Sequence, residues 1–150
     1  MRVVIQRVKK ASISIDNELF SSIKHGLLIL CGFENNDNSS DIEWLIKKIS
    51  QLRIFNDEQD LMNKSIVDVD GEVLLVSQFT LHAKTKKGNR PSYIHAAKPD
   101  ISIPLYNEFI DKFNTALPNK IKSGKFGANM QVELINDGPV TIIIDTKNKE

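Results

Sequence analysis

The sequence contains few of the residues that build disulfide frameworks or metal sites. It has one cysteine, Cys31, and three histidines among 150 residues. One cysteine cannot form a disulfide within the chain, and the position of Cys31 in the apolar run Leu27–Phe33 indicates a buried, inert thiol. No HxxxH or CxxC pattern is present, so we expect no metal ion and no cofactor. The sequence also lacks the phosphate-binding loop GxxxxGK[ST], which disfavours a nucleotide triphosphatase.

Long hydrophobic runs and a strong net charge are missing as well. No stretch approaches the roughly 20 apolar residues of a membrane-spanning helix, and the N-terminus does not match a secretory signal peptide. We therefore expect a cytoplasmic protein without membrane contact. The formal net charge is +1, so any contact with RNA must come from local patches and shape. A hydrophobic fraction of 41% fits one domain that spans residues 1–150.

Apolar periodicity and turn residues predict the order strands, helix, strand, helix, strands. An apolar face at three-four spacing predicts a helix capped by Ser39 or Ser40, and a second such face predicts a helix capped by Ser102 with Pro104 in its first turn. This order favours an α+β fold with two main helices and a mostly antiparallel, barrel-like sheet. The predicted strands are Val3–Val8, Ala11–Ile15, Leu19–Ile23, Leu27–Phe33 (buried on both faces), Gly71–Leu81, Met130–Ile135 and Val140–Asp145.

Hydroxyl groups near the end of the Gly71–Leu81 segment are the candidates for a nucleophile. Ser77 and Thr80 lie there, and strand alternation places Thr80 on the same face as His82. Residues two apart on a strand are about 6.5 Å apart along its axis, too far for a hydroxyl–imidazole hydrogen bond without bending. A small-ester hydrolase that uses His82 therefore stays open as a disfavoured alternative.

The next segment is rich in positive charge. Lys84-Thr85-Lys86-Lys87-Gly88-Asn89-Arg90 carries four cations in seven residues, and Lys120, Lys122 and Lys125 form a second basic stretch. A basic loop beside a polar strand end suits a phosphate backbone, because its cations displace condensed counterions. A solvated surface loop without a partner explains the same residues equally well.

Two short motifs narrow these alternatives. The first is Ser77-Gln78-Phe79-Thr80-Leu81, and the second is Asn136-Asp137-Gly138-Pro139-Val140-Thr141, which alone indicates only a hairpin turn between two strands. Together, at this spacing, they resemble the two signatures of the D-aminoacyl-tRNA deacylase family. The resemblance covers almost the whole chain, because Ile5–Val8, Thr85–Ser92 and Gly124–Ala128 agree in the same order.

The resemblance implies a homodimer with the fold of these deacylases and a site at the subunit interface. Such an enzyme hydrolyses the ester bond between a D-amino acid and tRNA, as proofreading of translation. Gly138-Pro139, with a cis peptide bond, would enter the partner's pocket, and its carbonyl groups would hold the substrate's amino group. An L side chain would find no room, which is specificity by exclusion, whereas glycyl-tRNA has no side chain and could be accepted.

The resemblance also implies roles for individual residues. Main-chain N–H groups at Phe79 and Thr80 would stabilise the oxyanion, Ser77 and Gln78 would position the terminal adenosine, and the 2′-OH of the tRNA would assist. Arg7 and Asn136 would support the Gly-Pro segment. A non-catalytic RNA-binding module of the same architecture remains the other alternative, favoured by the basic stretches.

Overall fold

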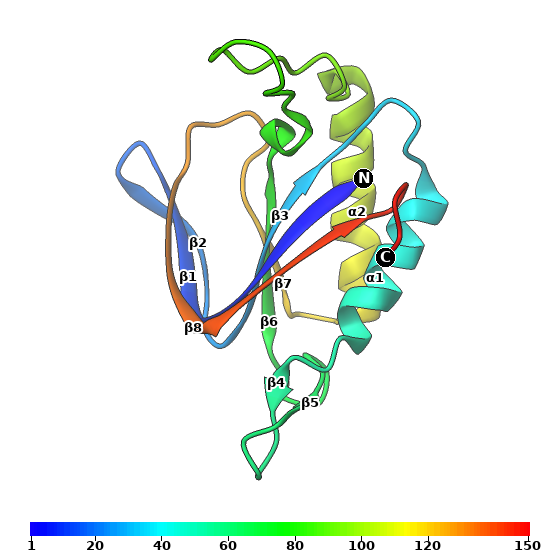
Figure 1. The fold of residues 1–150 in the computed structure, drawn as a ribbon. Helices are drawn as coiled ribbons and strands as arrows, with labels where there is room; N and C mark the ends of the chain where they lie inside the picture. The colour runs from blue at the N-terminus through cyan, green and yellow to red at the C-terminus, as the bar shows by residue number, and fades with distance from the viewer.

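The structure is a computed structural model that describes residues 1–150. Both helices lie on one side of a strongly curved sheet (Figure 1). A short two-stranded hairpin, β4–β5, projects from the end of the molecule. The elements are β1 (Arg2–Ile15), β2 (Glu18–Ile23), β3 (Gly26–Gly32), α1 (Ser39–Gln51), β4 (Phe55–Asn56), β5 (Met62–Lys64), β6 (Glu72–Ser77), the 3₁₀ helix η1 (Phe79–His82), α2 (Pro99–Ala116), β7 (Ile121–Ser123) and β8 (Gln131–Asp145).

The large sheet is mixed. Its strand order is β2-β1-β3-β6-β7, and β8 adds to β1. Strand β1 pairs antiparallel with β2, β3 and β8, whereas β6 runs parallel to both β3 and β7. The long strands β1 and β8 bend together, so that the sheet nearly closes into a barrel (Figure 1). The predicted α+β, barrel-like fold with two main helices is confirmed, with more parallel pairing than expected.

Two apolar clusters fill the two sides of this sheet. The larger one lies between the sheet and the helices and the smaller one inside the curve of β1, β2 and β8. Strand β3 contributes to both clusters, which confirms that the Leu27–Phe33 run is buried on both faces. Strand β1 supplies Val3 and Ile5 to the larger cluster and Val8, Ala11 and Ile13 to the smaller one, because bulges shift its alternation.

The helix starts differ from the prediction. Asn38, not Ser39 or Ser40, caps α1: its Oδ1 accepts from the Ser40 N–H at 2.9 Å, and Asp41 accepts from the Asn38 N–H at 3.1 Å. Helix α2 begins at Pro99, which suits a first helical position because its missing N–H would be unbonded there. Consequently Ser102 and Pro104 lie within α2, and the Ser102 hydroxyl donates to the Lys98 carbonyl at 3.0 Å.

Two strand predictions are wrong in ways that matter for the site. Strand β6 ends at Ser77, and Phe79–His82 forms η1, so strand alternation does not extend to His82. The last two predicted strands form one continuous strand, β8, both halves of which pair with β1. The predicted turn is instead a bulge: between the pairs Gln6–Thr141 and Val8–Asn136, residues 137–140 face only Arg7.

Candidate functional site

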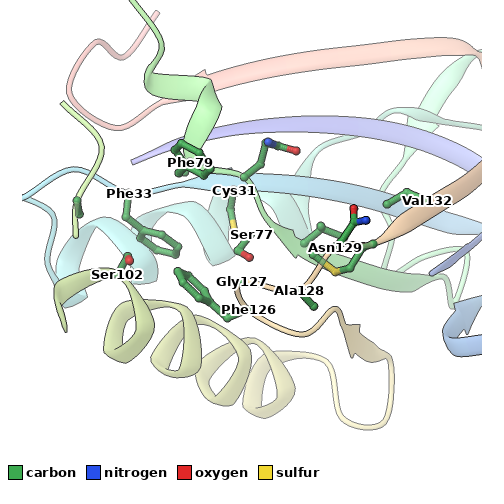
Figure 2. Close-up of a pocket in the computed structure, with 15 residues that line it drawn as sticks. Cys31, Phe33, Ser77, Phe79, Ser102, Phe126, Gly127, Ala128, Asn129 and Val132 are labelled. Atoms are coloured by element: carbon green, nitrogen blue, oxygen red, sulfur yellow. The ribbon is translucent and has the colours of Figure 1, made fainter. Parts of the chain in front are cut away.

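A pocket of about 310 Å³ opens where β3 and β6 end (Figure 2). Its walls come from the ends of these two strands, the start of α2 and the loop after β7. Aromatic rings and hydroxyl groups face each other across it (Figure 2). The lining residues are Cys31, Gly32, Phe33, Val76, Ser77, Gln78, Phe79, Ala97, Ser102, Phe126, Gly127, Ala128, Asn129, Met130 and Val132.

Close packing between η1 and β3 shapes the pocket wall. The Gln78 N–H donates to the Cys31 carbonyl at 2.7 Å, and the chain then turns into η1. A Cβ on Gly32 would lie 2.8 Å from the Gln78 carbonyl oxygen and 2.9 Å from the His82 ring. Position 32 must therefore be glycine for η1 to rest directly against β3.

The first motif is gathered at this wall. Ser77, Gln78 and Phe79 line the pocket, and Thr80 is joined to them by a hydrogen bond of 2.6 Å from Gln78 Nε2 to Thr80 Oγ1. The Phe79 side chain is 55% exposed and meets the edge of Tyr93, with ring centroids 5.0 Å apart. The structure thus brings these four predicted residues together, while their chemical roles stay predictions.

His82 is not placed to activate Thr80. Its side chain is buried, and its Nδ1 lies 3.4 Å from a carboxylate oxygen of Glu34. The Thr80 hydroxyl is already bonded to Gln78. Because residues 79–82 form a 3₁₀ helix, the strand geometry that suggested a Thr80–His82 pair does not exist. The alternative of a His82-dependent hydrolase loses its geometric basis.

Cys31 also lines the pocket, but its thiol is unreactive. Burial raises the pKa of Cys31 far above its usual range, which keeps the thiol neutral. The prediction of a buried cysteine is confirmed.

The second motif forms a separate feature on β8. The Gly138-Pro139 peptide bond is cis, and both residues are exposed, as is Asn136. Arg7, only 6% exposed, donates from Nε to the Asp137 carbonyl at 2.9 Å, so the expected contact between Arg7 and this segment is present. Gly138 has a φ of +127°, and a Cβ there would lie 3.0 Å from Arg7 Nη2.

The two motifs do not meet within one chain. Gly138 and Pro139 are absent from the pocket lining, which β8 reaches only through Val132. One chain therefore carries both a pocket and a braced, outward-facing Gly-Pro segment that its own pocket does not use.

Comparisons with known proteins agree over the full length. Residues 4–145 match the family model described as D-Tyr-tRNA(Tyr) deacylase. The chain belongs to this family. It is 62% identical to a D-aminoacyl-tRNA deacylase of Bacteroides fragilis and 59% identical to one of Flavobacterium psychrophilum, each over 100% of both chains. The family predicted from the two motifs, and the prediction that the chain is a deacylase, are confirmed.

Solved structures support the same fold. A protein described as c-Myc DNA unwinding element binding protein has a TM-score of 0.92 and 40% identity, over 97% of this chain and 98% of that one. A second structure, described as a probable eukaryotic D-amino acid tRNA deacylase, has a TM-score of 0.77 and 18% identity over 95% and 97%. The latter likeness shows the fold alone.

The deacylase carries its unbalanced positive charge beside the pocket. No acidic residue lies between Glu72 and Asp100. The basic loop, residues 84–90, is exposed, and its four cations form none of the ion pairs in the structure. Backbone hydrogen bonds between Lys84 and Ser92 join the two ends of this loop, which follows η1 in the chain.

Sequence reasoning missed the far wall of the pocket. Phe126–Met130 come from the loop after β7, where the sequence agreed with the family at Gly124–Ala128 but suggested no role. The Tyr106 hydroxyl holds this loop by donating to the carbonyl oxygens of Leu75 at 2.8 Å and Gly124 at 3.3 Å.

No group of three or more His, Cys, Asp or Glu side chains lies close enough to bind a metal ion. Neither helix has the length and apolar character that a membrane span requires.

Proposed function

We propose that this protein hydrolyses the ester bond between a D-amino acid and the 3′ end of tRNA and spares the L ester. The observation that carries the proposal is the pairing of two features: a pocket with Ser77, Gln78 and Phe79 on one wall, and an exposed Gly138-Pro139 segment braced by Arg7. Membership of the deacylase family gives the reaction class.

The pocket suits a terminal nucleoside. Nucleobases stack on aromatic rings and hydrogen-bond through their edges. The rings of Phe79 and Phe126 and the polar groups of Ser77, Gln78 and Asn129 offer both kinds of contact (Figure 2). A base seated here places the esterified ribose beside η1.

Main-chain groups of η1 then stabilise the reacting carbonyl. Phe79 and Thr80 open this helix, so their N–H groups have no acceptor within it. Removing one oxyanion-hole donor typically costs about 2.7–4 kcal/mol of barrier. With Cys31 neutral and His82 turned to Glu34, the protein orients and stabilises, and the tRNA 2′-OH assists the attack of water.

The Gly138-Pro139 segment enters the pocket of a second copy of the chain. Strand β8 exposes the apolar side chains of Leu134, Ile135 and Ile143 on either side of this segment. An isologous dimer buries such a strand twice and inserts one Gly-Pro segment into each pocket. The carbonyl oxygens hold the substrate's amino group, an L side chain meets the wall, and glycyl-tRNA is also accepted.

The basic loop, residues 84–90, contacts the phosphate backbone of the tRNA near its acceptor end. Its four unpaired cations lie directly after η1, and phosphate contacts position a nucleic acid without reading its sequence. A cytoplasmic location, where aminoacyl-tRNA is used, follows from this substrate.

The first test is hydrolysis of D-tyrosyl-tRNA against L-tyrosyl-tRNA by the purified protein in the presence of EDTA. We expect rapid loss of the D ester while the L ester persists. Hydrolysis of both esters contradicts the exclusion of L side chains by the Gly138-Pro139 segment, and no hydrolysis of either contradicts the proposed function. Loss of activity only with EDTA would overturn the expectation of a metal-free reaction.

Mixed dimers test whether the site is shared between subunits. Phe79→Ala damages the pocket of the chain that carries it, whereas Pro139→Ala damages the Gly-Pro segment that this chain inserts into the pocket of the other chain. In co-expressed dimers, half are mixed and each mixed dimer has one intact site of two, so about a quarter of the wild-type D-selective activity returns. If the site lay within one chain, mixing would restore nothing.

A nucleic-acid-binding module without catalysis is the second candidate. The basic loop favours it, and the relative of 40% identity is named for binding a DNA element. Pro139→Ala separates the two functions: binding of uncharged tRNA is unchanged in either case, whereas stereoselective hydrolysis is lost only if the protein is a deacylase.

A further inference from the structure

The guanidinium group of Arg7 lies between β8 and the β4–β5 hairpin. On one side its Nε donates to the Asp137 carbonyl at 2.9 Å, directly before Gly138. On the other side its Nη1 donates to the Ile54 carbonyl at 2.6 Å and to Asn56 Oδ1 at 3.1 Å. Acceptors on two separate elements therefore fix the orientation of one buried cation.

The Asn56 amide is itself oriented. Its Nδ2 donates to Asp60 Oδ1 at 2.7 Å, at the turn of the hairpin. Because the amide nitrogen is held by Asp60, the amide oxygen faces Arg7. The hydrogen bonds thus run from the hairpin turn through Asn56 and Arg7 to Asp137.

A second contact links the same hairpin to Asp137. Phe55 of β4 is almost fully buried and meets the His25 ring edge-on, with ring centroids 5.1 Å apart. His25 Nε2 lies 3.9 Å from a carboxylate oxygen of Asp137. Both side chains that approach this carboxylate, Arg7 and His25, therefore rest on the β4–β5 hairpin.

We propose that Asn56 is a positioning residue for stereoselectivity: through Arg7 it fixes where the Gly138-Pro139 segment stands. The inference rests on the proposed function, in which this segment excludes L side chains. Exclusion by a wall depends on its position to within a fraction of an ångström. Without Asn56, the Arg7 guanidinium keeps fewer acceptors on the hairpin, and the exposed bulge at residues 137–140 gains freedom to move aside.

Three variants test this proposal. Asn56→Ala removes the acceptor, whereas the double variant Asn56→Asp/Asp60→Asn keeps an oxygen for Arg7 and, with donor and acceptor exchanged, the hydrogen bond between positions 56 and 60. Asn63→Ala is the matched control, since Asn63 lies on the same hairpin and donates only to Asp57, at 2.7 Å. We expect Asn56→Ala to lower the ratio of D to L hydrolysis by about tenfold, the loss of one hydrogen bond to a charged group. The double variant Asn56→Asp/Asp60→Asn should restore the ratio, and Asn63→Ala should leave it unchanged.

A second readout does not depend on activity. Hydrogen exchange of the Arg7 Nε–H, followed by NMR, should accelerate in Asn56→Ala and stay slow in Asn63→Ala. If the wild type fails to hydrolyse D-tyrosyl-tRNA, the proposed function is wrong, and this exchange rate still tests the positioning. A folded Asn56→Ala protein with a wild-type D to L ratio overturns the proposal, as does an equal loss in Asn63→Ala.

Discussion

Replacing Gly138 by alanine tests the Gly-Pro segment at its most constrained point. The φ of +127° lies far outside the left-handed well that L residues can use, and strained conformations of this kind cost about 1–3 kcal/mol. The added Cβ would also lie 3.0 Å from Arg7 Nη2 and from Val140 Cγ2. Arg7 cannot yield without weakening a charge-assisted bond, which is worth about 1.5–3 kcal/mol.

These terms together predict that Gly138→Ala destabilises the fold by roughly 3–5 kcal/mol. At about 2–4 °C per kcal/mol for a chain of this size, the melting temperature should fall by at least about 6 °C. Gly88→Ala is the control, since Gly88 also has a positive φ, +69°, but a Cβ there meets nothing within 4 Å. Its cost should be only about 1–2 kcal/mol.

The assay combines thermal unfolding, followed by circular dichroism, with hydrolysis of D- and L-tyrosyl-tRNA. Gly138→Ala should lose the preference for the D ester at temperatures where it is still folded. Gly88→Ala should keep the wild-type ratio of D to L hydrolysis, because the basic loop contacts the tRNA and not the amino acid. Equal losses of stability and selectivity in both variants would refute the reasoning, because the contact with Arg7 would then contribute nothing.

Three further predictions concern RNA contact, acid stability and the pocket loop. Lys86→Ala with Lys87→Ala should raise KM for aminoacyl-tRNA at unchanged kcat, and should flatten the plot of log affinity against log salt by about 0.7–0.9 per lost phosphate contact. Burial alone would raise the pKa of Asp145, but the Lys147 N–H and the Arg2 guanidinium outweigh it and hold this pKa below its usual value. This carboxylate therefore adds stability above about pH 4, and that stability is lost as the pH falls through its folded-state pKa. In urea unfolding, the free energy of unfolding of Asp145→Asn should be lower than that of the wild type at pH 7, and the difference should shrink toward pH 2. Tyr106→Phe should cost about 0.5–1.5 kcal/mol in urea unfolding, because the buried carbonyl groups of Leu75 and Gly124 lose the hydroxyl group that donates to them.

Local sequence patterns predict those parts of the fold in which apolar residues follow a regular pattern. The Leu27–Phe33 run is apolar throughout, and β3 is indeed covered on both faces. The two helices follow from their apolar spacing, and only their caps were misplaced. The end of β6 could not be predicted this way, because it depends on η1 packing against Gly32, a contact between segments about 50 residues apart.

The error at the second motif has a similar cause. Asp137-Gly138 is a common hairpin signal, yet β8 passes through it as one strand because both of its halves pair with β1. The extra residues bulge outward opposite Arg7, where a buried guanidinium can bond to their backbone. A turn-forming sequence thus becomes a rigid projection instead of a chain reversal, and only the pairing partner decides between the two outcomes.

The proposed mechanism also explains why side-chain patterns alone could not reveal the chemistry. In a serine or metal hydrolase, the reacting groups are side chains, and their types and spacing mark the sequence. Here the groups assigned to catalysis and chirality are the N–H groups of Phe79 and Thr80 and the carbonyl groups of Gly138-Pro139. Every residue type has a backbone carbonyl, and every type but proline has an N–H. What the sequence must specify is the backbone path, through Gly32, Gly138 and the buried Arg7. The scarcity of cysteine and histidine is therefore compatible with an enzyme of this kind, and the two short motifs are the places where the required backbone geometry constrains the sequence.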